Sequence, residues 1–118
     1  MPADTLAKLV EANTLIRHRK LQEARAFLKQ LISELGEDDV SERMVAAGLL
    51  SDVLRYIVLE IPDKEKRKEY NPEMQAYARM VLENYDRAPG DEQQGFRNGN
   101  DIDVYRKYIA AIDRSLAK

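Results

Sequence analysis

The stretch LQEARAFLKQLISELG, residues 21–36, decides the fold. Its large apolar residues recur every three or four positions, which places them on one face of an α-helix. Gly36 follows where a left-handed carboxy-terminal cap is expected. The stretch therefore predicts an amphipathic helix over residues 21–35, with a packing face made by Leu21, Ala24, Leu28, Leu31 and Leu35.

A second helical pattern precedes this stretch. Leu6, Leu9, Val10 and Ile16 have helical spacing and predict a helix from about 5 to 18. Because only residues 18–20 separate the two helices, the chain must fold back as an antiparallel hairpin.

Three more helices are predicted after the hairpin. Residues 42–60 follow a capping Ser41 and are apolar nearly all round, which is typical of a helix at the centre of a bundle. Asn71-Pro72 is a helix start signal for residues 72–87. The last helix begins at about 101, and its apolar face is expected to hold Ile102, Tyr105, Ile109, Ile112 and Leu116.

The connections are short, with one exception. KEKRK, residues 64–68, predicts no more than a short exposed helical turn, while residues 88–100 contain three glycines and predict a loop whose mobility the sequence leaves open. Phe96 either anchors this loop onto the helices, the preferred interpretation, or contacts a partner. The expected fold is all-α: one domain over residues 1–118, built as an antiparallel five-helix α/α stack or bundle.

Residues 3–36 resemble a tetratricopeptide (TPR) repeat, a pair of helices in 34 residues. Ala12 and Ala24 occupy the small positions where the two helices cross, and Leu28 and Leu31 follow on the packing face. The turn departs from the pattern, because Arg19 stands where the family usually has glycine. The resemblance implies a TPR-like stack that binds a peptide or helix in a groove.

Composition excludes several chemistries. Cysteine is absent and His18 is the only histidine, so neither a thiol nucleophile nor a Cys- or His-rich metal site is expected. No catalytic motif occurs, so we expect neither an enzyme nor a cofactor, although an enzyme with unobvious carboxylate chemistry stays open. The net charge of −2 and the lack of a long apolar run predict a cytoplasmic protein that does not enter membranes.

Two groups of residues are candidates for partner binding. The first is a set of tyrosines on the last two long helices, since tyrosine is enriched at recognition surfaces. These rings either line a binding groove or pack at the core edge with their hydroxyls in water. They are Tyr77, Tyr85, Tyr105 and Tyr108.

The second group is the basic run Arg17, His18, Arg19 and Lys20 between the first two helices. Its simplest interpretation is a solvated helix end, where cations complement the helix dipole. Contact with an acidic partner is the functional alternative. Arg25 and Lys29 extend the run and leave nucleic-acid binding through residues 17–29 as a further alternative, although acidic neighbours dilute it.

Together these features favour a non-catalytic protein–protein interaction module, a TPR-like adaptor or chaperone that binds a peptide or helix of a partner protein. One alternative is a structural homodimer, in which self-association buries apolar surface that five helices leave uncovered. Another is a nucleic-acid-linked regulator that uses the 17–29 face.

Overall fold

The chain folds entirely into helices and loops over the residues that the computed structural model describes, residues 2–116, with side chains to residue 114. The predicted all-α class is confirmed, with five long helices and two short ones. Leu116 is expected on the last apolar face, but its side chain lies outside the described set. The helices are α1 Ala3–Arg17, α2 Leu21–Glu34, α3 Val40–Leu59, α4 Lys64–Lys68, α5 Asn71–Arg87, α6 Gly90–Arg97 and α7 Ile102–Leu116.

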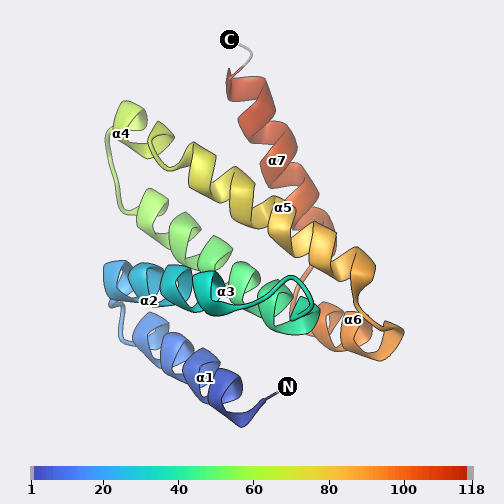
Figure 1. Ribbon diagram of the computed structural model, residues 1–118. Helices are drawn as coiled ribbons and strands as arrows, with labels where there is room; N and C mark the ends of the chain where they lie inside the picture. The colour runs from blue at the N-terminus through green and yellow to red at the C-terminus, as the bar shows by residue number, and fades with distance from the viewer. Residues whose placement is uncertain (1, 117–118) are drawn as a thin grey trace.

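The first two helices form the expected antiparallel hairpin (Figure 1). Ala12 of α1 and Ala24 of α2 are fully buried, and their small side chains allow the two helices to approach closely. The turn depends on Arg19, which has a φ of 58° in the left-handed region that favours glycine. This backbone conformation lets α2 begin two residues later.

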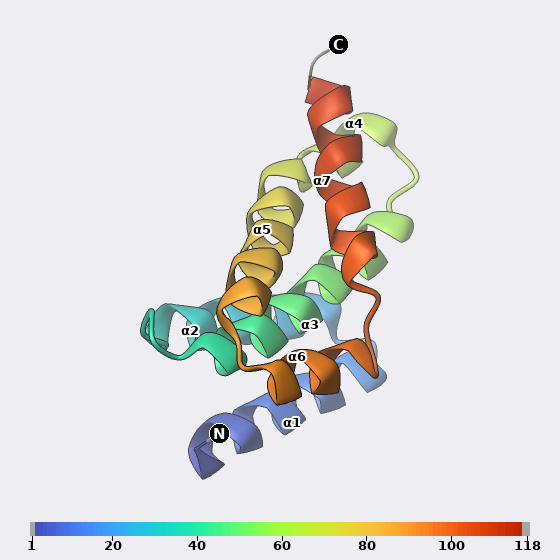
Figure 2. The same ribbon diagram turned by 90° about the vertical axis from the view of Figure 1, so that its right-hand side faces the viewer.

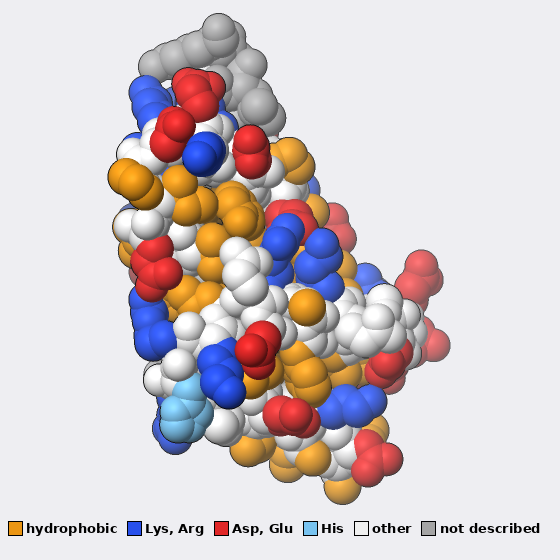
Figure 3. All heavy atoms as spheres, turned by 90° about the vertical axis from the view of Figure 1, so that its left-hand side faces the viewer, with side chains coloured by type: hydrophobic (Ala, Val, Ile, Leu, Met, Phe, Trp, Pro, Cys, Tyr) orange, Lys and Arg blue, Asp and Glu red, His pale blue; other side chains and the backbone are white. Residues whose placement is uncertain are grey.

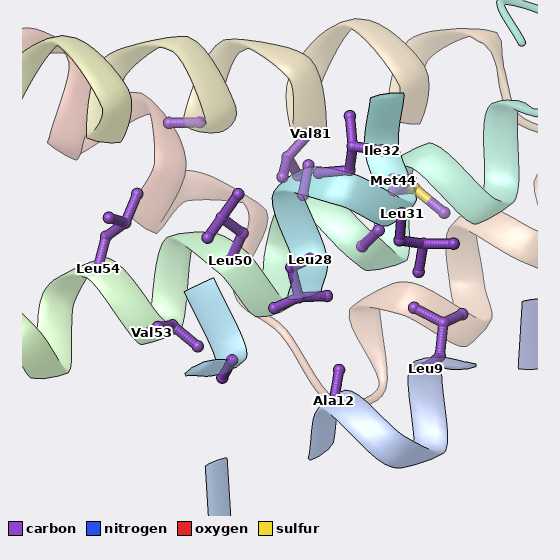
Figure 4. Close-up of a cluster of buried hydrophobic side chains, with 14 of the residues drawn as sticks. Leu9, Ala12, Leu28, Leu31, Ile32, Met44, Leu50, Val53, Leu54 and Val81 are labelled. Atoms are coloured by element: carbon purple, nitrogen blue, oxygen red, sulfur yellow. The ribbon is translucent and has the colours of Figure 1, made fainter. Parts of the chain in front are cut away.

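Helix α3 is at the centre of the molecule. It contacts α1, α2 and α5, and α5 in turn contacts α7 (Figure 1). Side chains from α1, α2, α3 and α5 converge in one continuous core (Figure 4). The nearly all-round apolar character of residues 42–60 thus has the predicted cause, because three helices cover this one. Its buried apolar residues are Met44, Ala46, Ala47, Leu50, Val53, Leu54 and Ile57.

The prediction of a loop over residues 88–100 is wrong for most of its length, because Gly90–Arg97 is helix α6. Phe96 is buried there between Tyr85 and Tyr105, as the anchoring interpretation required. In addition, the Gln93 side-chain amide donates to the Tyr85 carbonyl. These tertiary contacts outweigh the low helix propensity of Gly90 and Gly95, a compensation that the local sequence does not reveal.

Two predicted helix ends are also wrong. Gly36 is not a left-handed cap, since Arg19 is the one residue between 2 and 116 with a positive φ. Instead, the Asp39 carboxylate accepts a hydrogen bond from the Gly36 N–H and shapes this turn. Ser41 lies inside α3, which begins at Val40, and its hydroxyl hydrogen bonds to Glu92 of α6.

Helix α6 lies beside the start of α3, where Glu92 accepts a hydrogen bond from Ser41. Figure 2 shows this short helix between the end of α5 and the start of α7.

No helix within residues 2–116 has both the length and the apolar character needed to cross a lipid bilayer.

Candidate functional site

The basic run forms an exposed corner between α1 and α2. The Arg19 guanidinium pairs with Glu60 at the end of α3 and lies 5.4 Å from the centre of the Tyr56 ring. No carboxylate among the described residues lies within ion-pair distance of Arg17 or Lys20. The corner therefore offers positive charge that the rest of the described chain does not neutralise.

A surface hollow of about 530 Å³ adjoins this corner. Its apolar part comes from α2, from the end of α3 and from the residue before α5. Figure 3 shows hydrophobic side chains gathered on the same face as the histidine, with cationic side chains around them. The lining residues are Arg19, Lys20, Leu21, Gln22, Glu23, Ile57, Glu60, Ile61 and Tyr70. The charged lining residues are two cations, Arg19 and Lys20, and two carboxylates, Glu23 and Glu60. Lys20 is the lining cation that has no ion-pair partner among the described residues.

Leu59, in the last turn of α3, is exposed but is not among the residues that line this hollow. Its side chain is 72% exposed, the largest exposure among the large hydrophobic residues described. Sequence reasoning assigned residues 56–61 only to a core helix, and it missed that their last turn emerges beside Lys20. Only the long-range packing of α2 on α3 brings the two segments together.

The other cations of the 17–29 face are engaged by Glu73 of α5. Arg25 donates two hydrogen bonds to the Glu73 carboxylate, at 2.9 and 2.7 Å, and Lys29 donates one at 2.6 Å. The hydrogen bond from Arg25 lowers the pKa of Glu73, and the same bond raises the pKa of Arg25. The 17–29 face is consequently interrupted by a carboxylate and is not a continuous cationic surface for phosphates.

The four predicted tyrosines do not line one groove. Tyr85 and Tyr105 are core residues, with exposed fractions of 8% and 3%, and both contact Phe96. Tyr108 is half-buried, edge-on to Tyr105, while Tyr77 lies near Arg25 of α2. The rings of Tyr85 and Tyr105 pack inside the core, which leaves no face for a partner, and the Tyr105 hydroxyl donates to the Asn100 side chain.

A small polar hollow of about 200 Å³ lies beside Tyr105 and Tyr108. Arg55 donates a 2.6 Å hydrogen bond to the Tyr108 hydroxyl. Burial raises the pKa of Asp52 against the opposing effect of Arg55, and burial also raises the pKa of Tyr105. Sequence reasoning overlooked Asp52, although a carboxylate within an apolar helix is a visible signal.

Metal binding finds no support in the described part of the chain. It holds no group of three or more histidine, cysteine, aspartate or glutamate residues placed to bind an ion. The candidate site is the basic corner with its adjoining hollow, which we call the corner site: Arg17, Arg19, Lys20, Ile57, Ile61 and Tyr70. No protein-family model, curated protein sequence or solved structure matches the chain.

Proposed function

We propose that the protein is a non-catalytic protein–protein interaction module, a cytoplasmic TPR-like adaptor or chaperone that binds an acidic, apolar segment of a partner at the corner site. The observation that carries this proposal is the coincidence of exposed apolar surface with unneutralised cations. Ile61 and Tyr70 line the hollow and are only half-buried, and Arg17 and Lys20 have no ion-pair partner among the described residues. A partner segment with leucine and aspartate side chains complements both features.

The backbone of Arg19 supports the same assignment. A left-handed conformation costs about 1–2 kcal/mol for a residue with a side chain. Arg19 nevertheless occupies this position and lies over Tyr56 at the mouth of the hollow. Strained positions of this kind are often functional, and within the molecule the Arg19 side chain pairs with Glu60 and lies over Tyr56.

Arg19→Gly separates binding from folding. Glycine accepts the left-handed backbone, so the variant keeps or gains stability, while it removes one cation from the corner site. The probe is a synthetic helical peptide of leucine and aspartate, followed by fluorescence anisotropy. We expect Arg19→Gly and Lys20→Glu each to weaken binding by about tenfold, equivalent to about 1.4 kcal/mol.

Lys107→Glu on α7 is the matched control, because it makes the same charge change away from the corner site. We expect this control to bind like the unaltered chain. A peptide with serine in place of leucine tests the apolar part and should bind weakly. If the leucine–aspartate peptide binds all variants equally, the corner site is not its binding surface.

Self-association is a second candidate, and one observation favours it. Leu6 and Val10 lie one turn apart on α1, beside the buried face of Leu9 and Ala12, and they are 53% and 59% exposed. Two of the three exposed large hydrophobic residues among those described therefore lie together on α1, and the third, Leu59, ends α3. Two copies joined through α1 would bury these side chains.

Analytical ultracentrifugation tests this candidate. A dimer that Val10→Asp dissociates and Leu59→Asp leaves intact supports an interface on α1. A monomer at every protein concentration excludes it.

A further inference from the structure

A second surface hollow lies at the opposite end of α3, between its first turns and α6. It has a volume of about 370 Å³ and is mainly apolar. We call it the α3–α6 cleft. Its lining residues are Ser41, Met44, Val45, Gly48, Leu49, Glu92, Gly95, Phe96 and Asn100.

The cleft has a firm apolar wall. Phe96 packs between the rings of Tyr85 and Tyr105, with ring centres 6.4 and 6.1 Å apart, so its position is fixed from behind. Val45 and Leu49 lie one helical turn apart on α3 and remain only half-buried. Binding surfaces commonly combine such a preformed apolar wall with a few polar groups.

Gly95 keeps the cleft open. A Cβ atom at this position would have no atom within 4 Å outside its own helix, so the space beside α6 is free. The contrast with Gly48 is clear, because a Cβ there would lie 3.3 Å from the Phe96 ring and from the Tyr105 hydroxyl. Gly48 serves the packing of the core, whereas Gly95 does not.

The entrance of the cleft is acidic. The hydrogen bond between Ser41 and Glu92 places the first turn of α3 beside the first turn of α6. Residues 37–43 and 91–97 hold six carboxylates and two arginines, Arg43 and Arg97, which leaves a formal charge of −4. The carboxylates are those of Glu37, Asp38, Asp39, Glu42, Asp91 and Glu92. An apolar hollow with this surrounding charge is complementary to an apolar side chain in a cationic environment.

We propose that the α3–α6 cleft binds a large apolar side chain presented by a lysine- or arginine-rich helical segment of a partner protein. The partner class is opposite in charge to the one assigned to the corner site. The two sites lie toward opposite ends of the 20-residue helix α3, and Val45 in the cleft is about 18 Å along the helix from Ile57 in the corner site at 1.5 Å per residue. This inference is therefore independent of the proposed function of the corner, and either can fail alone.

Gly95→Leu tests the cleft directly, since a leucine side chain there has room to fill it without displacing the core. The probe is a synthetic amphipathic helical peptide of leucine and lysine, with binding followed by fluorescence anisotropy. We expect Gly95→Leu to weaken binding by at least about tenfold, as for other central contacts of an interface. Gly90→Leu, at another glycine of α6 with open space around it, is the control and should bind normally.

Two further binding experiments separate recognition of the apolar side chain from recognition of the peptide's charge. Glu92→Lys reverses an exposed charge at the entrance and should weaken binding of the same peptide, most strongly at low salt. A peptide with serine in place of leucine should bind at least about tenfold more weakly, because it lacks the apolar anchor. Equal binding of the serine and leucine peptides would mean that only charge is recognised, and it would overturn the proposal.

If something other than a basic partner segment fills the α3–α6 cleft, these experiments give different results. If the protein sediments as a dimer that Gly95→Leu dissociates, a second copy fills the cleft and the proposal is wrong. Unchanged peptide binding by Gly95→Leu, in a variant whose circular dichroism shows normal helix content, is equally decisive against it.

Discussion

Gly48 is the residue of α3 at which a single methyl group has the clearest consequence. A Cβ atom there would contact the Phe96 ring and the Tyr105 hydroxyl at 3.3 Å, and Phe96 cannot retreat because Tyr85 lies behind it. We expect Gly48→Ala to destabilise the fold by about 1–2 kcal/mol, because overpacking outweighs the gain in helix propensity.

Gly95→Ala is the matched control, another helical glycine but with free space at its Cβ. We expect it to stabilise the fold by about 0.5–1 kcal/mol. Urea denaturation followed by circular dichroism measures both changes. Equal effects of the two substitutions on stability would show that helix propensity, and not the packing of Phe96 against residue 48, determines the change.

Asp52 gives a second prediction at the residue scale. Burial raises its pKa, so the ionised carboxylate is less favourable in the folded state than in the unfolded state. Stability therefore decreases as the pH rises from the usual aspartate pKa through the folded pKa, and this cost persists at neutral pH. We expect Asp52→Asn to raise the urea midpoint at neutral pH and to lose this advantage below the usual aspartate pKa. A variant that is less stable at neutral pH would contradict this prediction.

At the scale of elements, the ion pairs of Arg25 and Lys29 with Glu73 join α2 to α5. Their contribution to stability depends on pH with the sign opposite to that of Asp52. Arg25 and Lys29 hold the pKa of Glu73 below its usual value. The resulting stability is present above the unfolded pKa of glutamate and is lost as the pH falls through the folded pKa. We expect Glu73→Gln to reduce stability by about 1–2 kcal/mol at neutral pH, a range for charged hydrogen bonds that remain partly exposed to water.

Glu83→Gln is the control for this prediction, because it alters an exposed carboxylate on the same helix. Its stability should remain within about 0.5 kcal/mol of the unaltered chain. The difference between Glu73→Gln and the unaltered chain should vanish in acid. A difference that persists below the folded pKa of Glu73 would assign the effect to packing instead of charge.

At the level of elements, periodicity predicted the long helices that bury one apolar face, and Leu21 to Leu35 is the clearest example. The central helix α3 was predicted instead from its apolar character on nearly all sides.

Helix α6 could not be predicted in either way. Phe96 is its only buried residue, and the partners of that ring, Tyr85 and Tyr105, lie on α5 and α7. A helix held by one buried ring and by hydrogen bonds that Gln93 and Glu92 make with other helices leaves no apolar repeat in its own sequence.

In the candidate site, too, local features could be predicted and long-range contacts could not. The cations of the corner were visible in the sequence because they are adjacent, whereas the hollow beside them needs Ile57, Ile61 and Tyr70 from two other segments. The tyrosines were predicted to bind a partner, but Tyr85 and Tyr105 are buried in the core. The TPR resemblance of residues 3–36 stays a prediction, as does the adaptor or chaperone role that it implies.

The whole molecule is expected to unfold as one cooperative unit, because a single core cluster extends from Leu9 of α1 to Tyr105 of α7. Helix content by far-ultraviolet circular dichroism and tyrosine environment by near-ultraviolet circular dichroism should therefore show coincident transitions in urea. Leu28 of α2 is fully buried, and Leu28→Ala should shift both transitions together by about 2–5 kcal/mol. If the α1–α2 hairpin were a separate unit, Leu28→Ala would shift part of the helix signal and leave the tyrosine signal in place.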